Sequence, residues 1–464
     1  MDRPLSTLPA VARKASRFNF LAAVLFLSLS LDYRAQAGGD LPQYIFTGCF
    51  VIAAVATLLY TRGAHYSRFA KQTRALFLLP VVLLPVTLMA YMLVVNPGSN
   101  DWPVAIHTYA AYFLLFLAFN AMYRIMMIVP LKICMRYFVA ATIISTIWRF
   151  FYGLTTSGID VDNVRYQILS PALPILLAYA IYSILSSERS TISSYALIAI
   201  AGVPMALSVT RTYLLTLGLT VAGIFVLYAA CRSGKVLIRL VSIIVKFSLA
   251  AIVAGVITLA VSPNSVYRWV TRLSSDYVVT HTDITGEARV AQTKAVYRSL
   301  AEDPFYAMFG RELGSSFTMD PADLPHAHLI TNKKAGRVLP QSDVLWATVA
   351  FNGGIVLLTG FVILFLSGIR RSFTLAREDL TRNPENPGLA VFTYIALVCL
   401  WSQSFTASET VAERLGPVMT AAIYALCVHL FDERSRQLAQ ARKRAALAPE
   451  PAPLRVVRSA GLEA

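Results

Sequence analysis

Long apolar runs alternate with short polar connections along most of the chain. A helix of roughly 17–25 mainly apolar residues crosses the hydrocarbon core of a bilayer. Twelve runs meet or approach this length, although the first and the eleventh are short. They predict helices over 18–33, 42–60, 75–95, 104–122, 137–153, 168–185, 191–208, 212–230, 239–261, 343–367, 388–402 and 416–431. The pattern therefore predicts an all-α polytopic membrane protein with about twelve transmembrane helices.

One connection is much longer than the others and separates the ninth and tenth predicted helices. Between residues 286 and 303 it carries apolar side chains at helical spacing, namely Ala288, Ala291, Ala295, Val296 and the ring of Tyr297. Pro304 is suited to end this helix. We therefore expect a large, partly helical loop. The predicted parts of the chain are transmembrane helices one to nine in 1–261, the loop in 262–342, helices ten to twelve in 343–431 and a basic tail in 432–464.

The basic residues show which side of the membrane each connection faces. One set of alternate connections, with both termini, holds 26 Lys and Arg residues, whereas the short connections of the other set hold five. Because cytoplasmic loops carry the excess of Lys and Arg, both termini are predicted to be cytoplasmic and the long loop to lie outside. Ala35-Gln36-Ala37 resembles a signal-peptidase site, so cleavage after the first helix is an alternative that leaves this topology unchanged.

Composition agrees with lipid as the solvent, since 56% of the residues are hydrophobic and only 14% are charged. The net charge of +16 follows from the cytoplasmic connections and does not require a nucleic acid partner. The five cysteines form no CxxC pair, which argues against a structural zinc site. Neither GxxxxGK[ST] nor GxGxxG occurs, which disfavours a nucleotide-driven mechanism. The tail from residue 432 is rich in Ala, Arg and Pro, and we expect it to be disordered or to lie on anionic lipid headgroups.

The outward-facing arginines are the first candidate site residues. Arg211 occupies a tight turn between the seventh and eighth predicted helices, and Arg289 projects from the loop helix. A guanidinium matches phosphate oxygens with two parallel donors, so such residues suit a lipid-linked diphosphate. The alternative for each arginine is snorkelling to headgroups or an ion pair with Asp276, Glu287 or Asp303.

Histidines and the loop-to-helix junction are the second set of candidates. His326 and His328 lie two residues apart in the loop, where either is suited to act as a base towards a sugar hydroxyl. They make a weak metal site without a third ligand, and solvated loop histidines are the alternative. Gln341 and Asp343 precede the tenth helix, where a substrate headgroup would lie. Capping of that helix and compensation of its dipole by Asp343 are the alternative for this residue.

Four short motifs occur in an order that resembles the O-antigen ligase and polymerase superfamily. They are Thr210-Arg211-Thr212, Gly286-Glu287-Ala288-Arg289, the turn from Asp303-Pro304 to Phe309-Gly310, and Gln341-Ser342-Asp343-Val344-Leu345 with Gly353-Gly354 downstream. The resemblance is best from about 165 to 370. It implies a GT-C-like, metal-independent glycosyltransferase without a cofactor, working on the periplasmic face of a bacterial inner membrane with polyprenyl-diphosphate-linked oligosaccharides as donor and acceptor.

One departure decides between the activities of that superfamily. Ligases carry a histidine, often assigned as the catalytic base, where this chain has Gln341, and glutamine accepts no proton at neutral pH. We therefore expect a polymerase of lipid-linked repeat units for O-antigen or exopolysaccharide, with a chain-length regulator and a flippase as partners. A ligase that transfers finished glycan to lipid A-core or another acceptor is the first alternative, and a flippase the second.

The resemblance also implies roles for single residues. Arg211 and Arg289 would hold the departing undecaprenyl diphosphate, while Gln341, Asp343, His326 or His328 would orient or deprotonate the acceptor. Six further residues are expected to bind substrate, namely Arg149, Arg165, Tyr213, Arg298, Arg311 and Asp343. No metal is expected, because the arginines replace the cation.

Overall fold

The structure is a computed structural model of the chain. It describes residues 8–32, 41–63, 65–95, 101–157, 168, 170–186, 192–208, 210–231, 234–261, 263, 284–311, 313–324, 338–339, 342–384, 386–405 and 414–447.

Every apolar helix predicted from the sequence has a counterpart in the structure. They are α1 (Leu8–Leu27) with η2 (Ser28–Leu31), α2 (Leu41–Tyr60), α3 (Arg68–Leu78) continuing through η3 (Leu79–Leu83) into α4 (Leu84–Val95), α5 (Trp102–Met126), α6 (Leu131–Ser157), α8 (Leu173–Ser186), α9 (Ile192–Ser208), α10 (Arg211–Ala230), α11 (Gly234–Val261), α16 (Leu345–Arg382), α17 (Leu389–Gln403) and α19 (Leu415–Leu447). Within the described residues, six helical segments are long and apolar enough to cross a membrane, and five shorter helices are apolar as well. The chain is thus an all-α membrane protein.

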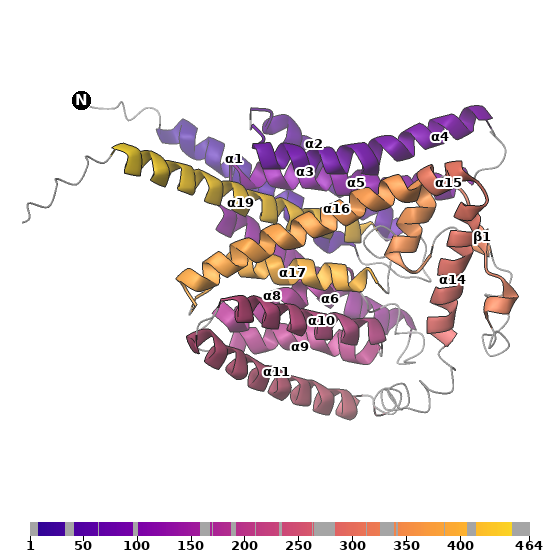
Figure 1. Cartoon of the computed structure of the whole chain (residues 1–464). Helices are drawn as coiled ribbons and strands as arrows, with labels where there is room; N and C mark the ends of the chain where they lie inside the picture. Colours follow the sequence, from indigo (N-terminus) through magenta and orange to yellow (C-terminus); the bar gives the residue numbers. More distant parts are fainter. Residues whose placement is uncertain are drawn as a thin grey trace, which may run out of the picture.

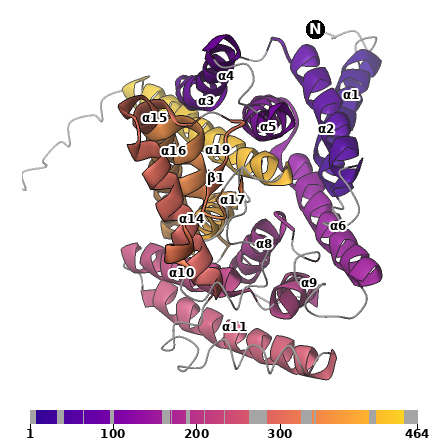
Figure 2. The same cartoon turned by 90° about the vertical axis from the view of Figure 1, so that its right-hand side faces the viewer.

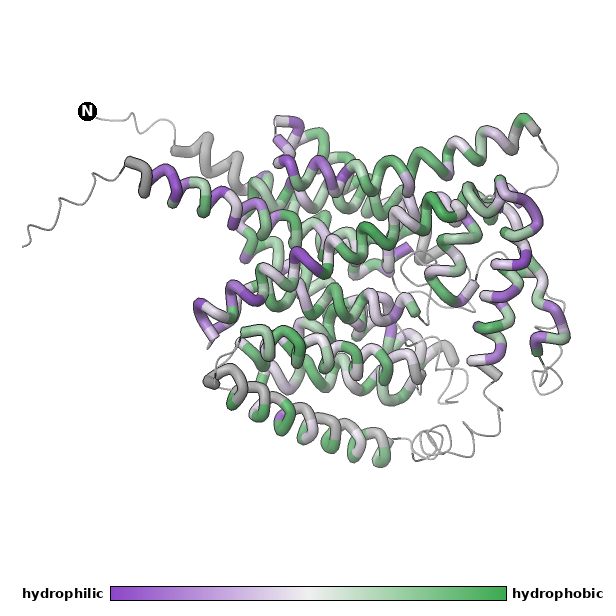
Figure 3. Tube along the Cα trace, in the orientation of Figure 1, coloured by the Kyte–Doolittle hydropathy of each residue, from purple (hydrophilic) through white to green (hydrophobic). Residues whose placement is uncertain are grey.

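The apolar helices form one bundle whose two ends differ (Figure 1). At one end α1 begins and α19 finishes, and we call this the termini end. At the other end α14 (Ile284–Ala301) runs across the bundle with α15 (Pro304–Phe309) and a small sheet, and we call this the α14 end (Figures 1 and 2). Hydrophilic residues gather at both ends, whereas the middle of the bundle is apolar (Figure 3).

The core of the bundle is built around α5, α17 and α19. Phe119 and Phe392 are fully buried, as expected of helices that other helices surround on all sides. A chain of polar contacts also crosses this core, because the Trp401 indole donates to the Tyr424 hydroxyl at 3.0 Å and that hydroxyl donates to the Leu364 carbonyl at 2.9 Å. Pairing buried polar groups in this way removes their desolvation cost and fixes α16, α17 and α19 relative to one another.

The helix predicted in the long loop is confirmed as α14, and Pro304 begins the short helix that follows it. Ala288, Ala291, Ala295 and Val296 are buried as predicted. The prediction for Tyr297 is wrong, because this residue is 51% exposed. The position after Val296 lies about 100° further around the helix, beyond the stripe that packs on the bundle.

Two short strands and a turn of 3-10 helix complete the described part of the loop. Antiparallel strands β1 (Phe317–Thr318) and β2 (Val338–Leu339) pair Phe317 with Leu339. The 3-10 helix η4 (Pro321–Asp323) lies between them in sequence and contacts α14.

The predicted disorder of the tail is wrong for residues 432–447, which continue α19 as helix. Ala, Arg, Gln and Leu are strong helix formers, and a helix that extends from a packed segment needs no new nucleus. Arg434 also forms an ion pair with Glu378 at 2.9 Å. Residues 448–464 lie outside the described part of the chain.

Candidate functional site

The α14 end is organised around a break in α16. Gly353 (φ −156°, ψ 19°) and Gly354 (φ 59°, ψ −156°) leave helical geometry and separate a short first segment from the rest of the helix. Before the break, Asn352 donates to the Tyr112 hydroxyl at 3.0 Å, which ties this segment to α5. The break therefore sets a short helical segment at the α14 end of the bundle.

The turn after α15 fits into this break. Gly310 has φ 83°, and the amide of Arg311 donates to the Phe351 carbonyl at 2.7 Å. A Cβ atom on Gly310 would lie 2.4 Å from the Gly353 nitrogen, and one on Gly354 would lie 2.3 Å from the Met308 carbonyl carbon. Only glycine tolerates both the backbone angles and the close approach. Two of the sequence motifs that are far apart along the chain thus form one contact.

A buried glutamine joins α14 to the start of α16. Gln292 is 3% exposed, and its Oε1 accepts from the Asp343 amide at 2.8 Å and from the Ser342 hydroxyl at 3.3 Å. Its Nε2 donates to Asp343 Oδ2 at 3.3 Å. Both ends of the amide are therefore used, and the helix that carries Arg289 is fixed to the junction that carries Asp343.

Ser342 and Thr348 close the start of α16 without help from Asp343. The Thr348 hydroxyl accepts from the Ser342 amide at 3.0 Å and donates to the Ser342 carbonyl at 2.7 Å. The N-cap position of α16 is Val344, and it has no side-chain cap. The alternative that Asp343 caps this helix is therefore wrong, and its carboxylate turns to Gln292 instead.

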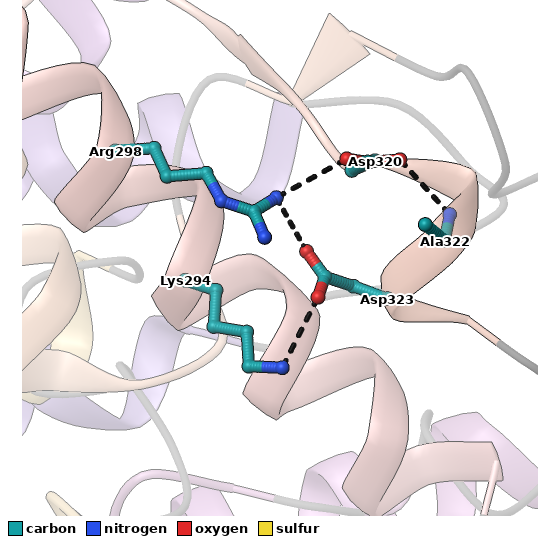
Figure 4. Close-up of polar contacts among 5 residues, drawn as sticks. All are labelled: Lys294, Arg298, Asp320, Ala322 and Asp323. Atoms are coloured by element: carbon teal, nitrogen blue, oxygen red, sulfur yellow. Dashed lines mark hydrogen bonds and ion pairs between the residues drawn. The ribbon is translucent and has the colours of Figure 1, made fainter.

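Three basic residues of this end are held by acidic neighbours. Lys294 pairs with Asp323 at 3.1 Å, and Arg298 pairs with Asp323 at 2.6 Å and with Asp320 at 3.4 Å (Figure 4). The hydrogen bond from Lys294, followed by that from Arg298, lowers the pKa of the Asp323 carboxyl below its ordinary value. Arg311 pairs with Glu302, donates to the Ser299 carbonyl at 3.1 Å and lies over the Tyr306 ring. Arg298 and Arg311 thus have structural partners.

Arg289 differs from those three residues. It is half-buried on α14, one turn before Gln292. Among the described residues its guanidinium makes no hydrogen bond or ion pair, and its buried Nε has no acceptor. A half-buried guanidinium in this state favours an anion beside it, because burial without a partner is unfavourable.

The other predicted site residues are spread over the bundle or fall outside the description. Arg211 is the first residue of α10 at the α14 end, but its side chain lies outside the described part (Figure 1). Tyr213, in the same turn, is 3% exposed, and Arg149 is 2% exposed on α6. Arg165, His326, His328 and Gln341 all lie outside the described residues.

Two residues that sequence reasoning did not select belong to this end. Gln292 interrupts the apolar stripe of α14 between Ala291 and Ala295. A polar residue within such a stripe indicates a buried hydrogen bond and could have identified Gln292 from the sequence. Arg414 precedes α19 and is 6% exposed; it donates to the Thr47 hydroxyl at 3.2 Å and lies over the Tyr44 ring. Within the described residues no group of three His, Cys, Asp or Glu side chains gathers to hold a metal.

The fold and the α14 end define an all-α membrane protein whose polar surface is organised by a helix lying across one end of the bundle (Figure 2). No family model and no curated protein matches the chain.

Proposed function

We propose that the chain is a membrane glycosyltransferase that polymerises polyprenyl-diphosphate-linked repeat units. The observation that supports it most is the state of Arg289, whose guanidinium has no acidic partner among the described residues while Lys294, Arg298 and Arg311 each have one. A diphosphate supplies the missing anion, since guanidinium donors match its oxygens.

The proposal includes a topology. All twelve apolar helices cross the bacterial inner membrane, the termini end faces the cytoplasm, and the α14 end faces the periplasm. The distribution of Lys and Arg along the sequence supports this orientation. α14 and α15 then lie at the outer membrane surface, where the headgroup of a lipid-linked sugar is located.

In the proposed reaction an acceptor hydroxyl of one repeat unit attacks the anomeric carbon of the lipid-linked donor glycan. The bond from that carbon to the diphosphate oxygen breaks, and the diphosphate leaves with the electron pair. Arg289, with Arg211 from the start of α10, stabilises the charge that develops on the leaving group. Such preorganised stabilisation is commonly the largest contribution to catalysis.

A deletion strain analysed by gel tests the activity. A polymerase is expected to leave single repeats attached to the acceptor without long chains. Accumulation of free long polymer would instead identify a ligase, and repeats trapped on the cytoplasmic face would identify a flippase.

Arg289→Ala tests the site, with Lys294→Ala on the same helix as the matched control. We expect Arg289→Ala to reduce chain formation about 10²–10³-fold at normal protein abundance, the range for removal of one preorganised donor. Lys294→Ala removes an exposed partner of Asp323 and should retain most activity. Equal activity of the two variants contradicts a diphosphate site at Arg289.

A further inference from the structure

Position 341 holds a glutamine, which cannot serve as a base, so another residue must take the proton of the acceptor hydroxyl. The contacts of Gln292 point to that residue. The amide of Gln292 engages only one oxygen of Asp343, Oδ2. Within the described residues the other oxygen, Oδ1, makes no hydrogen bond, and Asp343 is exposed as a residue. One oxygen of the carboxylate is therefore fixed while the second stays open to solvent.

Gln292 is well suited to hold this carboxylate in one orientation. It is 3% exposed, so its own side chain has little freedom, and its Oε1 accepts from the backbone amide of Asp343 and from the hydroxyl of Ser342. The backbone and the carboxylate of one residue are thus held by the same amide. A leucine at 292 would hold neither, and a glutamate would have no hydrogen to donate to the carboxylate.

We propose that Gln292 and Asp343 form an acceptor-activating pair: Asp343 Oδ1 takes the proton of the acceptor hydroxyl, and Gln292 is the residue that positions it. This inference rests on the proposed function, since it names the base for the same transfer. As the new carbon–oxygen bond forms, the hydroxyl proton passes to Oδ1, and the diphosphate leaves with the electrons of the bond that breaks. The proton is later released from Asp343 to water.

The position of the pair supports this role. Gln292 lies one turn after Arg289 on α14, so their side chains are neighbours on the helix surface. The contact through Gln292 keeps the base at a fixed place relative to the residue proposed to hold the leaving group. Reactions of this kind depend on such placement, because a shift of about 1 Å can cost about 10²-fold in rate.

Steady-state kinetics of the full chain in lipid nanodiscs, with defined lipid-linked donor and acceptor, tests the pair. Asp343→Asn keeps the shape and still offers an oxygen to Gln292, so the fold should persist. We expect kcat to fall about 10²–10⁴-fold, the contribution of general base catalysis, with the KM for donor changed less than threefold. Asp320→Asn, a loop carboxylate beside Arg298, is the matched control and should keep kcat within threefold. A kcat for Asp343→Asn within threefold of the control overturns the proposal.

The exchanged pair Gln292→Glu with Asp343→Asn separates catalysis from structure. It restores one donor and one charged acceptor across the contact but moves the carboxylate to a buried position. If Asp343 is the base, the double variant regains the thermal stability that Gln292→Glu loses. Its kcat, however, stays far below that of the natural chain. Recovery of both would mean that the pair is only structural. Donor binding, measured by competition with polyprenyl diphosphate, should survive in these variants and be lost in Arg289→Ala, so failure of the base and failure of the diphosphate site give different results.

Discussion

The two ends of the bundle are both rich in polar side chains, yet they use them differently. At the termini end, Asp432 is 3% exposed and one oxygen accepts from Ser67 at 2.6 Å and from Tyr123 at 2.8 Å, which joins α3, α5 and α19. Its other oxygen is buried and has no hydrogen-bond partner among the described residues. At the α14 end, Arg289 and one oxygen of Asp343 have no partner among the described residues. Polar groups that bind each other hold helices together, whereas unpaired groups on residues that solvent reaches, such as Arg289 and Asp343, are available to a ligand.

The largest expected effect of a structural substitution comes from the break in α16. Gly310→Ala places a Cβ atom 2.4 Å from the Gly353 nitrogen at a positive φ of 83°, so the contact between α15 and α16 must open. We expect a loss of about 2–4 kcal/mol in the stability of the α14 end. Thermal unfolding in detergent and protease cleavage near residue 310 measure it.

Gly218→Ala on α10 is the matched control, because a Cβ atom there meets nothing within 4 Å. It should be neutral or slightly stabilising. Similar stability of the two alanine variants would contradict the close contact at the break.

A smaller effect is expected at the termini end. Asp432→Ala leaves the hydroxyls of Ser67 and Tyr123 without their acceptor and should cost about 1–3 kcal/mol of stability. Turnover per folded molecule should not change, because Asp432 joins helices away from the proposed site. Glu433→Ala, an exposed neighbour, is the control. Lower turnover of Asp432→Ala at unchanged stability would contradict a purely structural role for Asp432.

The sequence was sufficient for the helices but not for the contacts between them. Apolar length is a local property that lipid imposes on each helix, so the positions of the twelve helices could be predicted one at a time. The extent of α19 was missed because its last turns are polar, and only contacts such as that of Arg434 with Glu378 distinguish a polar helix from a disordered tail.

The candidate site shows the same limit. Arg289 was selected because a charge in that position suggests a ligand. What distinguishes it from Arg298 is that Arg298 forms ion pairs with Asp320 and Asp323, which lie more than twenty residues after Arg298 in the sequence. Gln292 was missed because its partners, Ser342 and Asp343, are fifty residues further along the chain. Pairings at such separations are decided by packing, which no local pattern encodes.

The smallest expected effect concerns the ion pairs that hold η4 against α14 (Figure 4). Because Lys294 and Arg298 lower the pKa of Asp323 in the folded state, the carboxylate stabilises this contact above its unfolded pKa of about 3.9. The contribution is lost as the pH falls through the lower, folded value, so the segment 313–324 should exchange its amide hydrogens faster below about pH 4. Hydrogen exchange measured between pH 3 and 7 checks this, and the effect should be small because the two basic side chains are exposed.

In Asp323→Asn the exchange should no longer change with pH beyond its intrinsic chemical dependence. The same acid-induced step in the variant and the natural chain would show that another group holds η4 in place.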